Sequence, residues 1–145
     1  MNFTTIIKEN IGPLLKTYGF IKSEETNGTR GSGVTYASVK LNLSLGFTNN
    51  TFEGTYTFWI ITDLLKDARA DVGIENFLLE EFLGVKRNPR SGAESEKIIA
   101  WTTETLDYFE KYKDNILTGD LAFYGKLNGF MRKSTIEYNK KMQGK

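Results

Sequence analysis

The feature that most constrains the fold is a pair of neighbouring segments in which apolar and polar residues alternate with a period of two. The first segment covers residues 35–47 and the second covers residues 51–61. Such alternation is typical of β-strands that have one buried face and one face in water. Asn49-Asn50 lies between the segments, and asparagine tolerates the positive φ angles of a two-residue hairpin turn. The sequence therefore predicts a hairpin centred on Asn49-Asn50.

The pairing imposed by this turn agrees with the hydrophobic pattern. It places Phe47 opposite Phe52 and Leu41 opposite Phe58, so that apolar residues face each other. A slip of one residue would set them against threonine and glutamate. Turn chemistry and side-chain pairing thus favour the same register.

The second face of this hairpin is polar near the turn and apolar at its far end. There the register places Lys40 opposite Trp59, which predicts a cation–π pair, with Tyr36 and Ile61 nearby. Exposed aromatic side chains cluster at binding surfaces. Tyr36, Lys40, Trp59 and Ile61 are therefore candidate partner-binding residues. Coverage of the same face by segment 63–95 is the alternative.

The remaining segments predict helices and two further strands. Apolar residues at three- and four-residue steps predict helices over about 3–18, 64–70, 74–84, 104–117 and from 121 onward, the first broken at Gly12-Pro13. Residues 19–26 and 96–101 are predicted strands, although 96–101 could also begin a helix. This order indicates an α+β fold, an antiparallel meander of three to four strands with the N- and C-terminal helices packed on one face.

The composition bounds the domain count and excludes several kinds of site. The 145 residues fit a single domain over 1–145. Cysteine and histidine are both absent, which removes thiolate chemistry, the commonest general base and the commonest transition-metal ligand. A net charge of +1 gives little attraction to nucleic acid or membranes. Neither a signal peptide nor a membrane-spanning apolar run is evident, so we expect a cytoplasmic protein.

Two segments suggest anion binding but have simpler explanations. The glycine-rich residues 27–33 lead into a strand, whereas a phosphate loop leads into a helix, so a flexible hairpin is favoured. Lys86, Arg87 and Arg90 form a small basic cluster without the stacking aromatic residues of nucleic-acid sites. A solvated loop is the simpler interpretation of this cluster.

The carboxylates also lack a catalytic or metal-binding pattern. Asp63, Asp67 and Asp71 lie at steps of four and would share one helix face, but exposure near a helix start explains them as well as a Mg²⁺ or Ca²⁺ site does. Glu75, Glu80 and Glu81 are predicted on the solvent-exposed side of the helix over 74–84. We expect no catalytic residues, no metal and no cofactor.

Two stretches carry a resemblance to a family. The segment LLKTYGFIK at residues 14–22 and the pattern WTT…LDYF from Trp101 to Phe109 resemble small bacterial α+β proteins, among them immunity proteins of polymorphic toxin systems. The resemblance implies a protein that binds and blocks a cognate toxin. Immunity proteins for basic nucleases are usually acidic, whereas this chain is nearly neutral, which points away from a cationic nuclease as the target.

The favoured hypothesis is a non-catalytic binding protein whose partner, another protein, docks on the second face of the hairpin. A secretion-type chaperone, which would form a dimer, and a small-ligand-binding module are the alternatives. A hydrolase that uses a carboxylate pair is a further alternative, for which no motif places two carboxylates together.

Overall fold

The computed structural model describes residues 2–28, 30–50, 55–65, 74–88 and 90–143. Strands β1 to β5 form one antiparallel sheet in sequential order. This confirms the predicted α+β meander, extended by a fifth strand of two residues. The elements in chain order are α1 (Phe3–Asn10), α2 (Gly12–Thr17), β1 (Ile21–Asn27), β2 (Gly31–Ser38), β3 (Leu43–Asn50), β4 (Tyr56–Thr62), β5 (Ile74–Glu75), α3 (Asn76–Leu83), α4 (Ser95–Lys111), α5 (Lys113–Ile116) and α6 (Leu121–Gln143).

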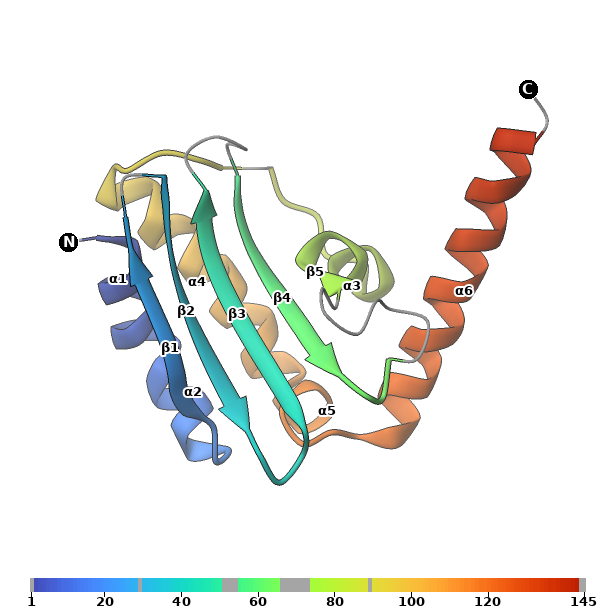
Figure 1. Ribbon diagram of the computed structural model, residues 1–145, viewed down its shortest axis with the longest axis horizontal. Coiled ribbons are helices and arrows are strands. Elements are labelled where there is room, and N and C mark those ends of the chain that lie inside the picture. The colour runs from blue at the N-terminus through green and yellow to red at the C-terminus, as the bar shows by residue number, and fades with distance from the viewer. Residues whose placement is uncertain (1, 29, 51–54, 66–73, 89, 144–145) are drawn as a thin grey trace.

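The helices lie on one side of the sheet and at one of its edges (Figure 1). Helices α1, α2, α4 and α5 lie behind the strands, and α3 and α6 lie beside the β4–β5 edge. No helix of the described ranges crosses the front of β1 to β4. The second half of α6 extends away from the rest of the molecule. One face of the sheet is therefore covered by helices, as the sequence predicts.

The N-terminal helix is broken where the sequence predicts. The Asn2 side chain caps α1 by accepting the backbone N–H of Thr5 at 2.9 Å. The helix restarts as α2 at Gly12-Pro13, because proline cannot donate a backbone hydrogen bond inside a helix. Gly19 follows α2 with a left-handed φ of 87°, which glycine adopts without steric cost.

Alternate residues of the central strands point into one apolar core. The rings of Phe47 and Phe58 lie 5.8 Å apart between their centroids, and that of Phe109 in α4 lies 5.2 Å from Phe58. These separations are typical of favourable aromatic pairs. Aromatic contacts between β3, β4 and α4 thus join the sheet to the helical layer.

The β2–β3 connection is a four-residue turn at residues 39–42, inside the segment predicted as one strand. Ser38 pairs with Leu43 across this turn. Asn42 adopts a left-handed φ of 51°, and its backbone N–H closes the turn by donating to the carbonyl oxygen of Val39 at 3.2 Å. Asparagine visits this conformation more readily than most residues. The prediction of one strand over 35–47 is therefore wrong.

This turn also changes which residues face the core. The even-numbered residues of β2, such as Tyr36, are buried, whereas in β3 the odd-numbered residues, such as Leu43, are buried. The sequence pattern hides the change, because Val39 and Leu41 continue the spacing of two through the turn. Val39 is nevertheless 87% exposed.

Strands β3 and β4 pair as neighbours, but in another register than predicted. Phe47 lies opposite Phe58 instead of Phe52, a shift of six positions. Asn49-Asn50 belongs to β3, so the predicted turn there is wrong, and Phe52 lies outside the described residues. Because six is an even number, the shift leaves each side chain on its predicted face. Phe58 therefore points inward, as predicted, and Trp59 outward.

Residues 96–101 belong to α4 and not to the predicted strand. The side chains that α4 buries include Ile98, Trp101, Thr105 and Phe109, which recur at steps of three and four. The strand prediction followed the β-branched and aromatic residues, whose preference for strands yields to burial of a helical face. Helix α4 packs this face against α1 and the sheet core.

The other local predictions divide into confirmed and untested ones. Helix α3 ends at Gly84 with a left-handed φ of 73°, and Asp120 caps α6 by accepting the N–H of Ala122 at 3.1 Å. The glycine-rich hairpin between β1 and β2 confirms the prediction for residues 27–33. Most of the helix predicted over 64–70 falls at residues 66–73, outside the described ranges.

Candidate functional site: the open face of the sheet

The face of the sheet opposite the helices is built mostly from small side chains. Strand pairing places its members in four rows, because paired residues point to the same side. The row nearest the β2–β3 turn is its apolar end, as predicted. We call this surface the open face: Ile21, Glu24, Thr26, Gly31, Gly33, Thr35, Ala37, Ser44, Gly46, Thr48, Asn50, Thr57, Trp59, Ile61 and Glu75.

Two of the four predicted binding residues lie on this surface. Trp59 is half-buried and stands between Gly46 on β3 and Glu75 on β5. Ile61 follows two residues later on the same side and is 37% exposed. The open face therefore presents an indole and a branched aliphatic side chain close together.

The other two predicted residues lie elsewhere. Tyr36 is 2% exposed and points into the core, because the β2–β3 turn reverses the phase of β2. Lys40 is exposed in the turn itself, whereas Trp59 lies opposite Gly46. The predicted placement of Tyr36 and Lys40 beside Trp59, with its cation–π pair, is wrong.

The described part of segment 63–95 follows the edge of the sheet and does not cross the open face. Glu75 pairs with Trp59 at the edge of β4. One residue further along the chain, the Asn76 side-chain oxygen accepts the backbone N–H of Phe58 at 3.3 Å, where a neighbouring strand would otherwise supply the acceptor. Helix α3 then lies beside this edge, with Asn76, Leu79 and Glu80 buried. These residues therefore contact the free edge of β4 at Phe58, Trp59 and Ile60 and leave the open face uncovered.

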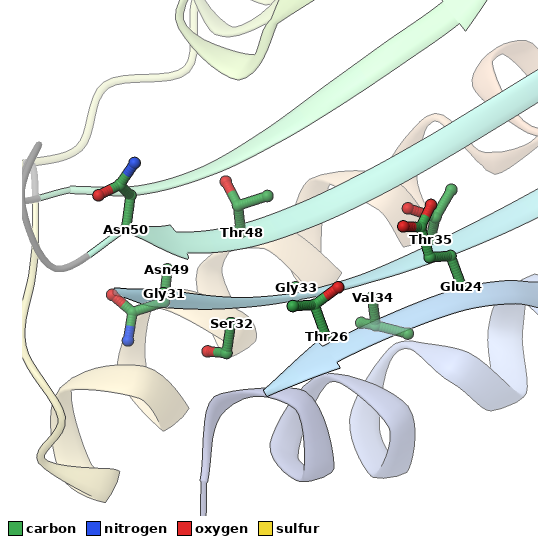
Figure 2. A pocket seen from close by; sticks show the side chains of 10 residues that line it. All are labelled: Glu24, Thr26, Gly31, Ser32, Gly33, Val34, Thr35, Thr48, Asn49 and Asn50. Carbon is green, nitrogen blue, oxygen red and sulfur yellow. The ribbon is translucent and has the colours of Figure 1, made fainter. Parts of the chain in front are cut away.

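A groove of about 310 Å³ crosses the open face over β1, β2 and β3. Figure 2 shows Thr48 and Asn50 along β3 on one side, and Glu24 and Thr35 together at one end. The groove exists because Gly31 and Gly33 carry no side chains above the backbone of β2. Sequence reasoning treated these glycines as hairpin residues and missed the groove.

A second polar site lies in the interior, between α3, α4 and the segment that joins them. Glu80 accepts three hydrogen bonds on one carboxylate oxygen, Oε2. The donors are Asn76 Nδ2 at 3.0 Å, Arg87 Nη2 at 2.6 Å and the Tyr108 hydroxyl at 2.9 Å. We call these four residues the buried polar cluster.

Arg87 makes further hydrogen bonds and two ring contacts besides its pairing with Glu80. Its Nη1 donates to the carbonyl oxygen of Trp101 at 3.2 Å and to Thr105 Oγ1 at 2.8 Å. The guanidinium carbon lies 5.0 Å from the centroid of the Trp101 ring and 5.5 Å from that of Tyr108. The side chain is 5% exposed, so the interpretation of Arg87 as part of a solvated loop is wrong.

Glu80 also departs from its predicted place on the wet side of the helix. Helix α3 buries Asn76, Leu79 and Glu80, whereas Phe77 is exposed. The i, i+4 spacing of Asn76 and Glu80 is the sequence feature that could have indicated a shared polar face. Burial of that face depends on Arg87 and Tyr108, which are distant in the sequence.

The chemistry of the buried polar cluster favours a structural role. Burial and the neighbouring Glu80 carboxylate raise the pKa of Tyr108 well above its ordinary value, so its hydroxyl stays a donor. A depression of about 380 Å³ beside α3 reaches Glu80 and Arg87, but both charges are already paired with each other. The cluster therefore fastens the α3–α4 connection to both helices.

The aspartates predicted on one helix face contribute no cluster in the described ranges. Asp63 accepts a hydrogen bond from the Asn42 amide, while Asp67 and Asp71 lie outside those ranges. Among the residues that the structure describes, no group of three acidic, histidine or cysteine residues could hold a metal ion.

The described helices include none whose length and apolar character would allow it to cross a membrane. No protein-family model, curated protein or solved structure matches the chain.

Proposed function

We propose that this chain is a non-catalytic binding protein whose protein partner docks on the open face of the sheet. The observation that carries the proposal is the position of Trp59 and Ile61 on a strand face over which no described helix passes. Large apolar side chains of this kind, tryptophan above all, dominate the energetics of protein interfaces.

The surroundings of these two residues suit a protein surface better than a small molecule. Their neighbours on β2 and β3 are mainly glycine, alanine, serine and threonine, which leave the backbone close to the surface. Small-molecule sites are usually concave and lined by apolar and aromatic side chains. A broad, shallow face with one apolar end is instead complementary to another folded surface.

The kind of partner follows from the resemblance to immunity proteins, under which it is a toxin that this chain blocks. Glu80 and Arg87 form an ion pair with each other, and Tyr108 donates a further hydrogen bond to Glu80. This pairing argues against a catalytic role for the two charged side chains. The net charge of +1 favours a toxin without a strongly basic surface, because a basic nuclease would call for an acidic inhibitor.

The test is a pair of matched isoleucine variants in a pull-down from an extract of the source organism. Ile61 on the open face is 37% exposed and Ile99 on α4 is 46% exposed. Ile61→Ala and Trp59→Ala should each weaken retention of the partner by about tenfold or more, because interface anchors contribute at least about 1–2 kcal/mol. Ile99→Ala should retain the partner as wild type does.

Photo-crosslinking locates the contact independently of affinity. A crosslinking amino acid at Thr57 should capture the partner, and the same amino acid at the exposed Asp107 of α4 should not. Equal retention by the Trp59→Ala variant and wild type, or capture only from position 107, would show that the partner does not dock on the open face.

A further inference from the structure

The groove on the open face has the form of a slot above bare backbone. Its floor is the main chain at Gly31 and Gly33, and its walls include Thr26 of β1 and Thr48 of β3. Thr35 closes one end, where its hydroxyl lies 3.4 Å from the position that a Cβ on Gly46 would take. The slot thus combines a flat floor with walls of threonine side chains. Thr48 turns its methyl group toward Gly33, while its hydroxyl oxygen lies 2.7 Å from that of Thr57 on β4.

Glu24 stands at this closed end, where it pairs with Thr35 and lines the groove. Its neighbour Glu25 points to the other face of β1 and binds Lys8 at 2.9 Å and Lys22 at 3.1 Å. Glu24, in contrast, has neither an ion pair nor a hydrogen bond from its side chain within the described ranges. A single carboxylate at the rim of the groove is therefore left for a cation from outside.

We propose that the groove accepts an arginine side chain of the partner protein, with Glu24 as its counter-ion. The inference rests on the proposed function, since it names a chemical feature of the partner that docks on the open face. A planar guanidinium can lie flat on the peptide groups of Gly31 and Gly33 and is more weakly hydrated than an ammonium group. Its N–H donors match the Glu24 carboxylate together with the hydroxyl of Thr26.

The direct test is an NMR titration of the ¹⁵N-labelled chain with N-acetyl-arginine amide. Saturable shifts should appear at the amides of Gly31, Gly33 and Thr48. The neutral isostere N-acetyl-citrulline amide and the cation N-acetyl-lysine amide should each bind more weakly than the arginine compound. Absence of saturable shifts at the groove would overturn the proposal, as would equal binding of the citrulline or the lysine compound.

Two adjacent variants separate the groove from overall charge. Glu24→Gln and Glu25→Gln change the net charge equally but lie on opposite faces of β1. Glu24→Gln should weaken arginine-amide binding about two- to fivefold, as expected for a solvent-exposed ion pair, and Glu25→Gln should not. An equal effect of both variants would show that the groove does not select the cation.

The outcome also distinguishes this inference from the proposed function. If the arginine compound fails to bind while Ile61→Ala still releases the partner, the arginine assignment is wrong and the docking face stands. If the arginine compound binds the groove but neither Ile61→Ala nor Trp59→Ala affects the partner, the groove is a guanidinium site and the open face is not the docking surface.

Discussion

The buried polar cluster and the open face treat charged groups in opposite ways. In the cluster, Glu80 and Arg87 are withdrawn from water, paired with each other and contacted by further hydrogen-bond partners and aromatic rings. On the open face, Glu24 stands at the rim of a groove without a partner among the described residues. Withdrawal of a charge from water is costly unless it is paired, whereas an exposed charge carries little such cost.

This difference indicates which polar residues serve the fold and which are available for a partner. The cluster joins α3, α4 and the connection between them, a segment with little regular structure of its own. Removing it should therefore affect stability and leave binding of the remaining folded molecules unchanged. Changes on the open face should chiefly weaken binding of the partner and cost little stability.

The largest expected effect is that of Arg87→Ala. The variant leaves the Glu80 carboxylate buried without its counter-ion, which should lower the free energy of unfolding by about 3–5 kcal/mol. Urea denaturation followed by circular dichroism measures the change. Arg90→Ala is the matched control, because Arg90 pairs with Glu104 at 3.2 Å on a half-exposed surface and should cost about 1 kcal/mol or less. Similar losses in the two variants would contradict burial of the Arg87 charge.

A smaller effect should follow from Gly12→Ala. A Cβ at this position would lie 2.8 Å from the Tyr36 hydroxyl oxygen, so we expect overpacking to cost about 1–3 kcal/mol. An alanine at an unobstructed helical position would instead stabilise the helix. The sign of the change in the free energy of unfolding therefore decides whether Tyr36 obstructs this position. In a double-mutant cycle, Tyr36→Phe should recover part of the loss, because it removes the obstructing oxygen. Absence of coupling would mean that Tyr36 does not face the core.

On the open face, Trp59→Ala should cost about 1 kcal/mol, since the half-buried indole stands beside Gly46 and small residues. The chain has two tryptophans, so fluorescence can compare the two regions directly. In a Trp101→Phe variant the remaining Trp59 emission should be quenched by acrylamide several times more strongly than Trp101 emission in Trp59→Phe. Equal quenching would show that Trp59 is covered, and would remove it from the docking surface.

Features set by local chemistry could be predicted from the sequence. The helix break at Pro13, the glycine after α2 and the glycine after α3 each follow from the φ angles and hydrogen bonds that these residues allow. The inward and outward faces of β3 and β4 were also predictable, because a register error of an even number preserves them. Trp59 and Ile61 were therefore found on the correct face from an incorrect pairing.

Features set by tertiary contact could not be predicted. The turn at residues 39–42 interrupts an unbroken alternation, and only the pairing of β2 with β3 reveals it. Burial of Glu80 depends on Tyr108, which lies 28 positions further along the chain. The groove appears only when β1, β2 and β3 are side by side, since its walls come from three strands. Local patterns report the period of an element but not its neighbours.

The smallest expected effect concerns Glu25, the neighbour of Glu24 on the opposite face of β1. Hydrogen bonds from Lys8, then Asn27 and Lys22, lower the pKa of Glu25 from 4.5 to about 2. Because the folded pKa lies below the unfolded value, the contribution of the ionised side chain is complete above pH 4.5. It is lost as the pH falls from about 4.5 to about 2.

Urea denaturation at a series of pH values from 2 to 6 tests this contribution. Stability should fall less steeply in Glu25→Gln than in wild type across that window, because the variant has no carboxylate to protonate at this position. A slope in Glu25→Gln equal to that of wild type would mean that the fold does not use the Glu25 carboxylate, and that its contacts with Lys8 and Lys22 contribute nothing to stability in this pH window.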